Sequence, residues 1–158
     1  MRIGFGYDVH RFVEGRELWL GGIRIDHPYG LLGHSDADVL IHAICDALLG
    51  AANLRDIGFH FPDTSDEFKN IDSKLLLCET MRLVREAGYE LENIDATLVA
   101  EQPKLNPYIP EMQKTLATVM YVAVNDVSLK ATTTEKLGFT GRDEGIAVYV
   151  VALLKYSK

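Results

Sequence analysis

The chain has 158 residues, is 47% hydrophobic and 25% charged, and carries a formal net charge of −7. These values are typical of one globular domain that buries its own core. The acidic balance argues against a nucleic acid or an anionic membrane as the main partner, but it allows small phosphorylated substrates, because bound metal ions can supply positive charge. No stretch reaches the ~18 apolar residues of a membrane helix.

The N-terminus begins in a strand pattern, so we expect no signal or transit peptide. Cys45 and Cys78 each lie in an apolar helical pattern and form no Cys-x-x-Cys motif. We expect two buried free thiols, which fits a reducing compartment and a cytoplasmic location. We also expect a single domain over residues 1–158, because the chain contains no internal repeat and no low-complexity linker.

Strand and helix patterns then alternate along the chain, with Gly and Pro at the junctions. Strands are expected over residues 2–10, 90–100, 126–133 and 146–155, with a short strand over 18–25 that Gly21-Gly22 interrupts. Helices are expected over about 36–52, 72–87 and 110–121, and a flexible loop over 138–145. This order predicts an α/β (α+β) layered domain, in which helices pack on one face of a mixed four-stranded sheet.

The first expected strand carries Asp8 and His10, which are two residues apart and therefore point to the same face. His42 lies in the expected helix 36–52, which can pack against that face. Two imidazoles and one carboxylate suit a divalent metal with an open coordination position, as in catalytic zinc sites. The alternative is a polar cluster that binds no metal.

Asp38, His42 and Asp46 are spaced by four residues and form one stripe of the same helix. A metal-bound histidine usually donates its second ring N–H to a carboxylate or a carbonyl, a role open to Asp38 or Asp46. The alternative is a solvated polar stripe. Ser35 and Asp38 have the spacing of a capping box, which places His34 and Ser35 at the helix N-terminus. Phosphate binding there and simple capping by Ser35 are compatible.

Two later segments supply further polar groups. Asp56-Ile57-Gly58 and Phe61-Pro62-Asp63-Thr64 offer loop carboxylates and backbone donors, although turn chemistry explains them equally well. Lys130-Ala131-Thr132-Thr133-Thr134-Glu135 ends a strand in three hydroxyls and a carboxylate, which suits a diphosphate with Glu135 on Mg²⁺ or Mn²⁺. Gly138-Phe139-Thr140-Gly141-Arg142 follows, and no Walker P-loop is present. Together these residues indicate a diphosphate substrate held by two metals.

The chain closely resembles the 2-C-methyl-D-erythritol 2,4-cyclodiphosphate synthase family of the non-mevalonate isoprenoid pathway. The matching stretches run through nearly the whole chain: Gly6-Tyr7-Asp8-Val9-His10, Gly33-His34-Ser35-Asp36, Ala47-Leu48-Leu49-Gly50-Ala51, Asp56-Ile57-Gly58, Phe61-Pro62-Asp63-Thr64, Pro103-Lys104 and the continuous block 130–142.

The resemblance implies a phosphorus–oxygen lyase reaction. The 2-phosphate of 4-diphosphocytidyl-2-C-methyl-D-erythritol 2-phosphate would attack the β-phosphorus, releasing CMP and forming the cyclic diphosphate. The nucleophile belongs to the substrate, so the enzyme supplies positioning and charge neutralisation.

The resemblance also implies roles for individual residues. Asp8, His10 and His42 would hold Zn²⁺, Glu135 would hold Mg²⁺ or Mn²⁺, and His34 and Thr133 would act in catalysis on the transition state. The substrate contacts would be Ser35, Asp56, Ile57, Gly58, Phe61, Pro62, Asp63, Thr64, Ser65, Ala100, Pro103, Lys104, Leu105, Asn106, Ala131, Thr132, Thr134, Phe139 and Arg142.

The cytidine pocket would be formed by residues 100–106 and 131–133, and Phe139 and Arg142 would contact phosphate or an isoprenoid diphosphate near a symmetry axis. The family is a homotrimer with active sites between subunits. The resemblance therefore implies sheets packed around a trimer axis, which also accounts for an apolar last strand.

Two rival interpretations stay open at this point. A zinc-dependent phosphoester hydrolase would use metal-bound water, but no general base is evident near Asp8, His10 and His42. A non-catalytic module would bind isoprenoid diphosphates through Phe139 and Arg142 and show no turnover.

Overall fold

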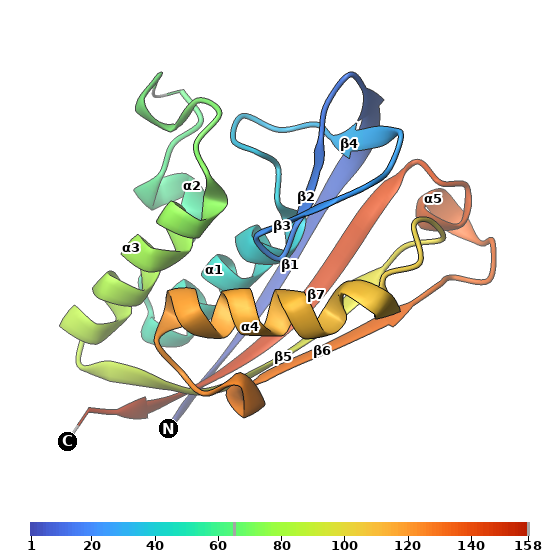
Figure 1. Ribbon diagram of the computed structural model, residues 1–158. Helices are drawn as coiled ribbons and strands as arrows, with labels where there is room; N and C mark the ends of the chain where they lie inside the picture. The colour runs from blue at the N-terminus through green and yellow to red at the C-terminus, as the bar shows by residue number, and fades with distance from the viewer. Residues whose placement is uncertain (65, 158) are drawn as a thin grey trace.

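The computed structural model describes residues 1–64 and 66–157. Its main layer is a five-stranded sheet in the order β4-β1-β7-β5-β6 (Figure 1). The strands are β1 (Arg2–Glu14), β4 (Tyr29–Leu31), β5 (Tyr89–Val99), β6 (Val127–Thr132) and β7 (Gly145–Tyr156). Only β5 and β6 pair in parallel among these neighbours, so the predicted mixed sheet is confirmed.

The prediction of four strands misses β4. This three-residue strand pairs antiparallel with residues 12–14 of β1, which itself runs four residues beyond its expected end. Gly30 and the preceding His27-Pro28 give the segment a turn-like composition, and strand pairing overrides that local preference. The expected strand over 18–25 is a hairpin of β2 (Leu18–Leu20) and β3 (Ile23–Ile25), with Gly21 and Gly22 at positive φ in its turn.

Three helices, α1 (Val39–Ala52), α3 (Ser73–Glu86) and α4 (Ile109–Met120), lie on the same side of the sheet, as predicted (Figure 1). Shorter turns of helix are α2 (Ile57–His60), η1 (Asp66–Phe68), η2 (Asn106–Tyr108), η3 (Val124–Asp126) and α5 (Gly138–Gly141). The α5 segment was expected to be an irregular loop. None of the described helices is long and apolar enough to cross a membrane.

Helix α1 begins at Val39 rather than near residue 36, so the predicted Ser35 capping box is wrong. Asp38 is the N-cap, and its carboxylate accepts the backbone N–H groups of Ile41, Gly21 and Gly22. One carboxylate thus caps the helix and closes the β2–β3 turn, which a serine hydroxyl cannot do for three donors. His34 and Ser35 consequently lie in the loop before the helix and do not cap it.

Glycines allow β1 to approach α1 at backbone distance. A Cβ atom built on Gly4 would lie 1.9 Å from the carbonyl oxygen of Ala47, and one on Gly6 would lie 2.0 Å from that of Ala43. The facing helix positions are alanines spaced by four, Ala43, Ala47 and Ala51. A seam of small residues therefore seats the helix directly on the strand.

The opposite face of the sheet is apolar and exposed. It carries Ile3, Phe5, Tyr7 and Val9 from β1, and Tyr149 and Val151 from β7, with Ile3 and Phe5 72% and 62% exposed. The alternate residues of β7 are buried under the helices, so this strand is apolar on both sides. Both cysteines are free, but only Cys45 is buried, and the expectation of a buried Cys78 is wrong because that side chain faces solvent.

We predict that Gly6→Ala lowers the free energy of unfolding by at least about 2 kcal/mol, because the added methyl group forces β1 and α1 apart. Gly50→Ala is the matched control, since a Cβ at that helical position meets nothing within 4 Å. It should raise stability by up to about 1 kcal/mol. Denaturant unfolding of both variants measures the difference, and equal midpoints would contradict the close approach.

Candidate metal centre

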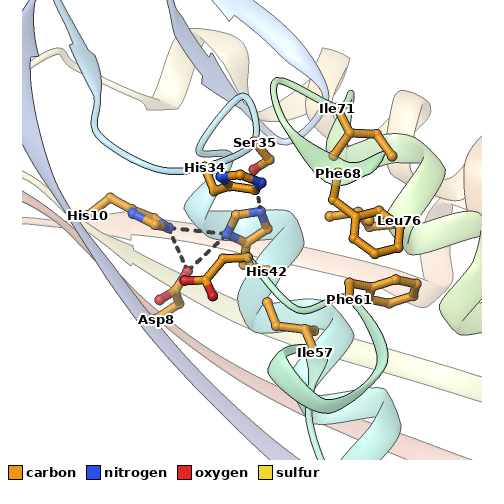
Figure 2. Close-up of a pocket in the computed structure, with 11 residues that line it drawn as sticks. Asp8, His10, His34, Ser35, His42, Ile57, Phe61, Phe68, Ile71 and Leu76 are labelled. Carbon is orange, nitrogen blue, oxygen red and sulfur yellow. Dashed lines mark hydrogen bonds and ion pairs between the residues drawn. The ribbon is translucent and has the colours of Figure 1, made fainter. Parts of the chain in front are cut away.

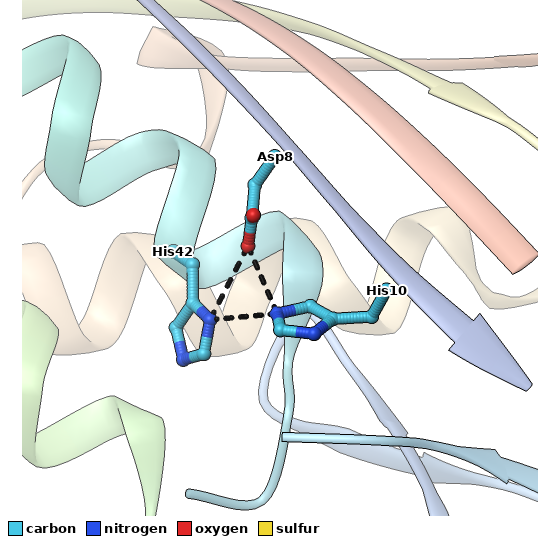
Figure 3. A group of neighbouring side chains, drawn as sticks. All are labelled: Asp8, His10 and His42. Atoms are coloured by element: carbon cyan, nitrogen blue, oxygen red, sulfur yellow. Dashed lines mark hydrogen bonds and ion pairs between the residues drawn. The ribbon is translucent and has the colours of Figure 1, made fainter. Parts of the chain in front are cut away.

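Three side chains converge where β1 meets α1 (Figure 3). Asp8 Oδ2 lies 3.0 Å from His10 Nε2 and 3.3 Å from His42 Nδ1, and the two ring nitrogens lie 3.2 Å apart. Asp8 and His10 come from the helix-facing side of β1, and His42 comes from the first turns of α1. The structure therefore brings together the three residues whose convergence the strand spacing predicted.

This triangle fits a divalent metal. Around a tetrahedral ion with bonds of about 2.0–2.1 Å, ligand atoms lie about 3.3 Å apart, which matches the observed edges. His10 Nδ1 lies 2.7 Å from the carbonyl oxygen of Leu32, so the neutral ring donates there and turns the lone pair of Nε2 toward Asp8. Asp8 Oδ2 is buried and has no hydrogen-bond donor among the described residues. A cation between these atoms would satisfy all three.

The pKa shifts of Asp8 and His10 are consistent with a site that binds a cation. Burial alone would raise the pKa of Asp8, but the facing rings of His10 and His42 outweigh burial and hold that pKa below its usual range. Burial would likewise lower the pKa of His10, but the Asp8 carboxylate outweighs it and raises that pKa. The cluster thus favours any positive charge placed among its members, whether a proton or a metal ion.

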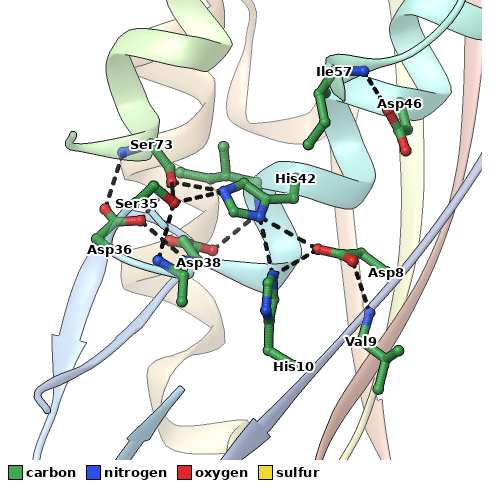
Figure 4. A network of polar contacts seen from close by, with 12 residues as sticks. Asp8, Val9, His10, Ser35, Asp36, Asp38, His42, Asp46, Ile57 and Ser73 are labelled. Atoms are coloured by element: carbon green, nitrogen blue, oxygen red, sulfur yellow. Dashed lines mark hydrogen bonds and ion pairs between the residues drawn. The ribbon is translucent and has the colours of Figure 1, made fainter. Parts of the chain in front are cut away.

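The remaining nitrogen of His42 faces away from the triangle. His42 Nε2 lies 3.0 Å from Ser73 Oγ and 3.1 Å from Ser35 Oγ, and all three residues are buried (Figure 4). Ser73 begins α3, and sequence reasoning missed it because no spacing along the chain links residue 73 to residue 42. Its only local signal is the preceding Asp72, the N-cap of that helix.

These contacts correct the expectation that Asp38 or Asp46 accepts a hydrogen bond from the ring of His42. Asp38 is committed to its three backbone donors, and Asp46 accepts the backbone N–H of Ile57 at 2.8 Å. Side chains spaced by four share a helix stripe, but the ring of His42 turns toward β1 on one side and α3 on the other. Asp46 instead attaches α2 to α1.

The metal centre opens into a pocket of about 210 Å³ (Figure 2). Sequence reasoning singled out eight of its eleven lining residues: Asp8, His10, His34, Ser35, His42, Ile57, Phe61 and Asp63. The other three are the apolar Phe68, Ile71 and Leu76, which form the wall opposite the polar cluster. They come from η1, the segment before α3 and α3 itself, and nothing in the sequence distinguishes them from core residues. The pocket therefore joins a metal site to an apolar wall and a loop carboxylate.

Other residues of the predicted loop lie around α2 without lining this pocket. Asp56 is the N-cap of α2 and accepts the backbone N–H of Phe59 at 2.9 Å. Gly58 lies within α2, Pro62 and Thr64 are exposed after it, and Ser65 falls outside the described residues. The turn role proposed as the alternative for Asp56 is thus present in the structure.

A second pocket, of about 170 Å³, lies at the ends of β5 and β6. Its lining consists entirely of predicted site residues: Ala100, Pro103, Lys104, Leu105, Asn106, Ala131, Thr132 and Thr133. It shares no residue with the pocket at the metal centre. Within one chain, the two predicted halves of the substrate site are therefore separate cavities.

The segment after β6 is held by its own side chains. Thr133 Oγ1 donates to Glu135 Oε1 at 2.9 Å, and Thr134 Oγ1 donates to the carbonyl oxygen of Leu137 at 2.6 Å. Glu135 is exposed and bonds Thr133, which lines the second pocket, so its carboxylate is accessible to a cation.

Of the two residues expected near a symmetry axis, one lines a pocket and the other pairs with a residue that lines it, Glu144. Phe139 lines a third pocket with Val9 and Arg11 of β1, whereas the Arg142 guanidinium pairs with Glu144 at 3.1 Å and does not line that pocket.

Comparison with known proteins places this geometry in a family. The YgbB family matches residues 1–155. A 2-C-methyl-D-erythritol 2,4-cyclodiphosphate synthase of Parabacteroides distasonis is 74% identical over 98% of this chain and 96% of its own length. The corresponding synthase of Porphyromonas gingivalis is 71% identical over 97% of this chain and 94% of its own.

Solved structures agree. A 2C-methyl-D-erythritol-2,4-cyclodiphosphate synthase in its CDP-bound form superposes with a TM-score of 0.89 at 38% identity, covering 98% of this chain and all of that one. The bifunctional IspDF of Campylobacter jejuni gives a TM-score of 0.95 at 48% identity, and this chain spans 42% of that longer one. The resemblance drawn from the motifs is confirmed, and the chain belongs to the YgbB family of 2-C-methyl-D-erythritol 2,4-cyclodiphosphate synthases.

Proposed function

We propose that this chain converts 4-diphosphocytidyl-2-C-methyl-D-erythritol 2-phosphate to 2-C-methyl-D-erythritol 2,4-cyclodiphosphate and CMP, as a phosphorus–oxygen lyase of the non-mevalonate pathway. An oxygen of the 2-phosphate forms a bond to the β-phosphorus, and the bond from that phosphorus to the oxygen shared with the α-phosphate breaks. The electron pair leaves with CMP. The observation that carries the proposal is the Asp8–His10–His42 triangle, in a chain 74% identical to a protein named for this product.

The proposal assigns the main roles as follows. Asp8, His10 and His42 would hold Zn²⁺, and Glu135 would hold Mg²⁺ or Mn²⁺. When bound, these ions supply positive charge that neutralises phosphate oxygens. His34 and Thr133 would donate hydrogen bonds to the oxygens on which charge develops in the transition state. For Thr133 this requires that its hydroxyl proton leave Glu135, whose carboxylate would then face the second cation. The erythritol part would lie against Ile57, Asp63 and the apolar wall.

The cytidine would occupy the second pocket, where Lys104 supplies a cation and the backbone of residues 100–106 supplies donors and acceptors. Structures of the family in complex with CDP support a cytidine nucleotide as the ligand. The segment from Thr132 to Glu135 would contact the diphosphate between the two pockets.

We further propose that the active unit is a homotrimer in which the metal centre of one chain faces the second pocket of its neighbour. The two pockets share no residue within one chain, which supports a substrate site that is completed by a neighbouring chain. The exposed apolar face of β1 and β7 supplies the surface that neighbouring sheets would cover. Contact of Phe139 and Arg142 with an isoprenoid diphosphate, and a cytoplasmic location, stay predictions.

Product analysis separates the proposal from its two rivals. Purified, zinc-loaded protein is incubated with the cytidyl substrate, and products are followed by mass spectrometry. CMP with the cyclic diphosphate supports the synthase, ring-opened monophosphates support a hydrolase, and binding without turnover supports a non-catalytic module.

His42→Ala should remove the metal and lower the rate of cyclisation by about 100-fold or more, because it deletes one of three ligands and leaves only Asp8 and His10 to hold the ion. Metal content per chain is measured by mass spectrometry after dialysis. His60→Ala is the control, because this ring bonds the carbonyl oxygen of Leu54, away from the triangle. Full metal content in His42→Ala would exclude the zinc assignment.

Glu135→Gln should abolish stimulation of the rate by Mg²⁺ or Mn²⁺, because the amide oxygen carries no net charge for a hard cation. We expect a loss of about 10–100-fold at saturating Mg²⁺, with the zinc content unchanged. Glu79→Gln removes a surface carboxylate that pairs with Arg82 on α3 and serves as the control. Unaltered metal dependence in Glu135→Gln would count against the second site.

Phe5→Asp should dissociate the trimer, since it places a charge at the centre of the exposed apolar face, and activity should fall in parallel. Analytical ultracentrifugation reports the mass of the assembly. Leu75→Asp, an equally exposed apolar position on α3, should leave both mass and activity unchanged. A Phe5→Asp protein that is monomeric and fully active would refute a site shared between chains.

A further inference from the structure

His42 can act as a metal ligand through Nδ1 only when its proton is on Nε2, since a neutral imidazole carries one N–H and one lone pair. For His10 this choice is made by the Leu32 carbonyl, which can only accept. For His42 the nearest groups do not decide the tautomer by themselves. Its Nε2 faces the hydroxyls of Ser73 and Ser35, and a hydroxyl can either donate or accept. Something beyond these serines must decide which nitrogen carries the proton.

The deciding group is Asp36. Its carboxylate can only accept hydrogen bonds, and it receives the backbone N–H of Ser73 at 2.9 Å, the backbone N–H of Asp38 at 3.1 Å and the hydroxyl of Ser73 (Figure 4). The single hydroxyl proton of Ser73 is thereby committed to Asp36. Toward His42, Ser73 Oγ then offers only lone pairs, so Nε2 must be the donor.

Ser35 cannot impose the same choice. Its Oγ accepts the backbone N–H of Ala37 at 3.1 Å and lies 3.5 Å from Ser73 Oγ, so its own proton has no carboxylate to bind. Without Ser73, the Ser35 hydroxyl is free to donate to Nε2, which would move the ring proton to Nδ1 and block the metal side. The two serine hydroxyls are about equally close to the ring, but only that of Ser73 donates its proton to a carboxylate.

We propose that Ser73 and Asp36 are positioning residues that fix His42 in its metal-binding tautomer, through a carboxylate–hydroxyl–imidazole relay. The relay has the form of the carboxylate–histidine pair found behind many zinc ligands, with a serine inserted between its members. The inference rests on the proposed function in taking Asp8, His10 and His42 as the metal ligands. It assigns a role to α3, which the sequence motifs do not touch.

The first test needs neither a metal nor a stability comparison. Long-range ¹H–¹⁵N correlation spectra of the metal-free protein, recorded at a pH at which the rings are neutral, report which nitrogen of His42 carries the proton, and His42→Ala assigns the signal. The relay predicts a predominant Nε2–H tautomer in wild type, although Asp8 Oδ2 and His10 Nε2 are acceptors that draw the proton toward Nδ1. In Ser73→Ala these acceptors are unopposed, and the tautomers should shift toward Nδ1–H. A predominant Nδ1–H tautomer in wild type would overturn the relay.

The second test compares two variants that each remove one hydroxyl about 3 Å from the same nitrogen. In competition with a chelator for Zn²⁺, Ser73→Ala should bind about 10–100-fold more weakly than wild type, whereas Ser35→Ala should stay within about threefold. Equal losses in both variants, or no loss in Ser73→Ala, would overturn the relay. Ser128→Ala, which removes a surface serine–aspartate hydrogen bond, controls for general effects.

The experiments distinguish a wrong metal centre from a wrong relay. If wild-type protein does not bind Zn²⁺ in the competition assay, the proposed metal centre is wrong, and the tautomer spectra still judge the relay. If Zn²⁺ binds to wild type at Asp8, His10 and His42, but Ser73→Ala keeps the wild-type Zn²⁺ affinity and the wild-type tautomer of His42, the metal centre is supported and the relay is wrong. Should Ser73→Ala not fold, the wild-type spectrum alone decides.

Discussion

The close approach of α1 to β1 is the constraint on which the rest of the structure depends. A Cβ atom on Gly4 or Gly6 would lie about 2 Å from a helix carbonyl oxygen, so the strand and helix meet backbone to backbone. Asp8 follows Gly6 by two residues on the same strand face, and His42 precedes Ala43 on the helix. The seam therefore sets the separation of Asp8 from His42. Any larger side chain in it would widen the metal triangle as well as the core.

The loop before α1, which borders the triangle, is held by hydrogen bonds to its backbone carbonyl oxygens. Arg16 donates to the carbonyl oxygens of Gly33 and Ser35, at 2.9 and 2.6 Å, on either side of His34. The carbonyl of His34 in turn accepts the backbone N–H of Asn70 at 2.8 Å. A guanidinium fork bonds two carbonyls at once, which fixes the orientation of the peptide units between them. Such a site is preorganised before substrate arrives, as electrostatic catalysis requires.

Sequence reasoning succeeded where the chemistry is local. The two-residue spacing of Asp8 and His10 fixes their common face in any strand. The residues that line the second pocket were expected from the resemblance to the family, not from their local spacing. Sequence reasoning failed where the partner lies elsewhere in the chain. The capping role of Asp38 depends on the β2–β3 turn, β4 forms only because β1 offers an edge, and Ser73 meets His42 only through the packing of α3 on α1. Tertiary contacts decide all three, and no spacing encodes them.

The separation of the two pockets and the exposure of the apolar sheet face can both be explained by association with neighbouring chains. On the proposed function, a substrate that carries a cytidine at one end and a phosphorylated erythritol at the other would reach both the metal triangle and the pocket at the ends of β5 and β6. One chain presents these as separate cavities and also leaves Ile3, Phe5 and Val151 in water, at a cost of about 25 cal/mol for each Å² of apolar surface. Covering that face with neighbouring sheets would remove this cost, and the same packing can bring the metal centre of one chain to the nucleotide pocket of the next. In such an assembly, stability and catalysis depend on the same contact, so selection for either maintains both.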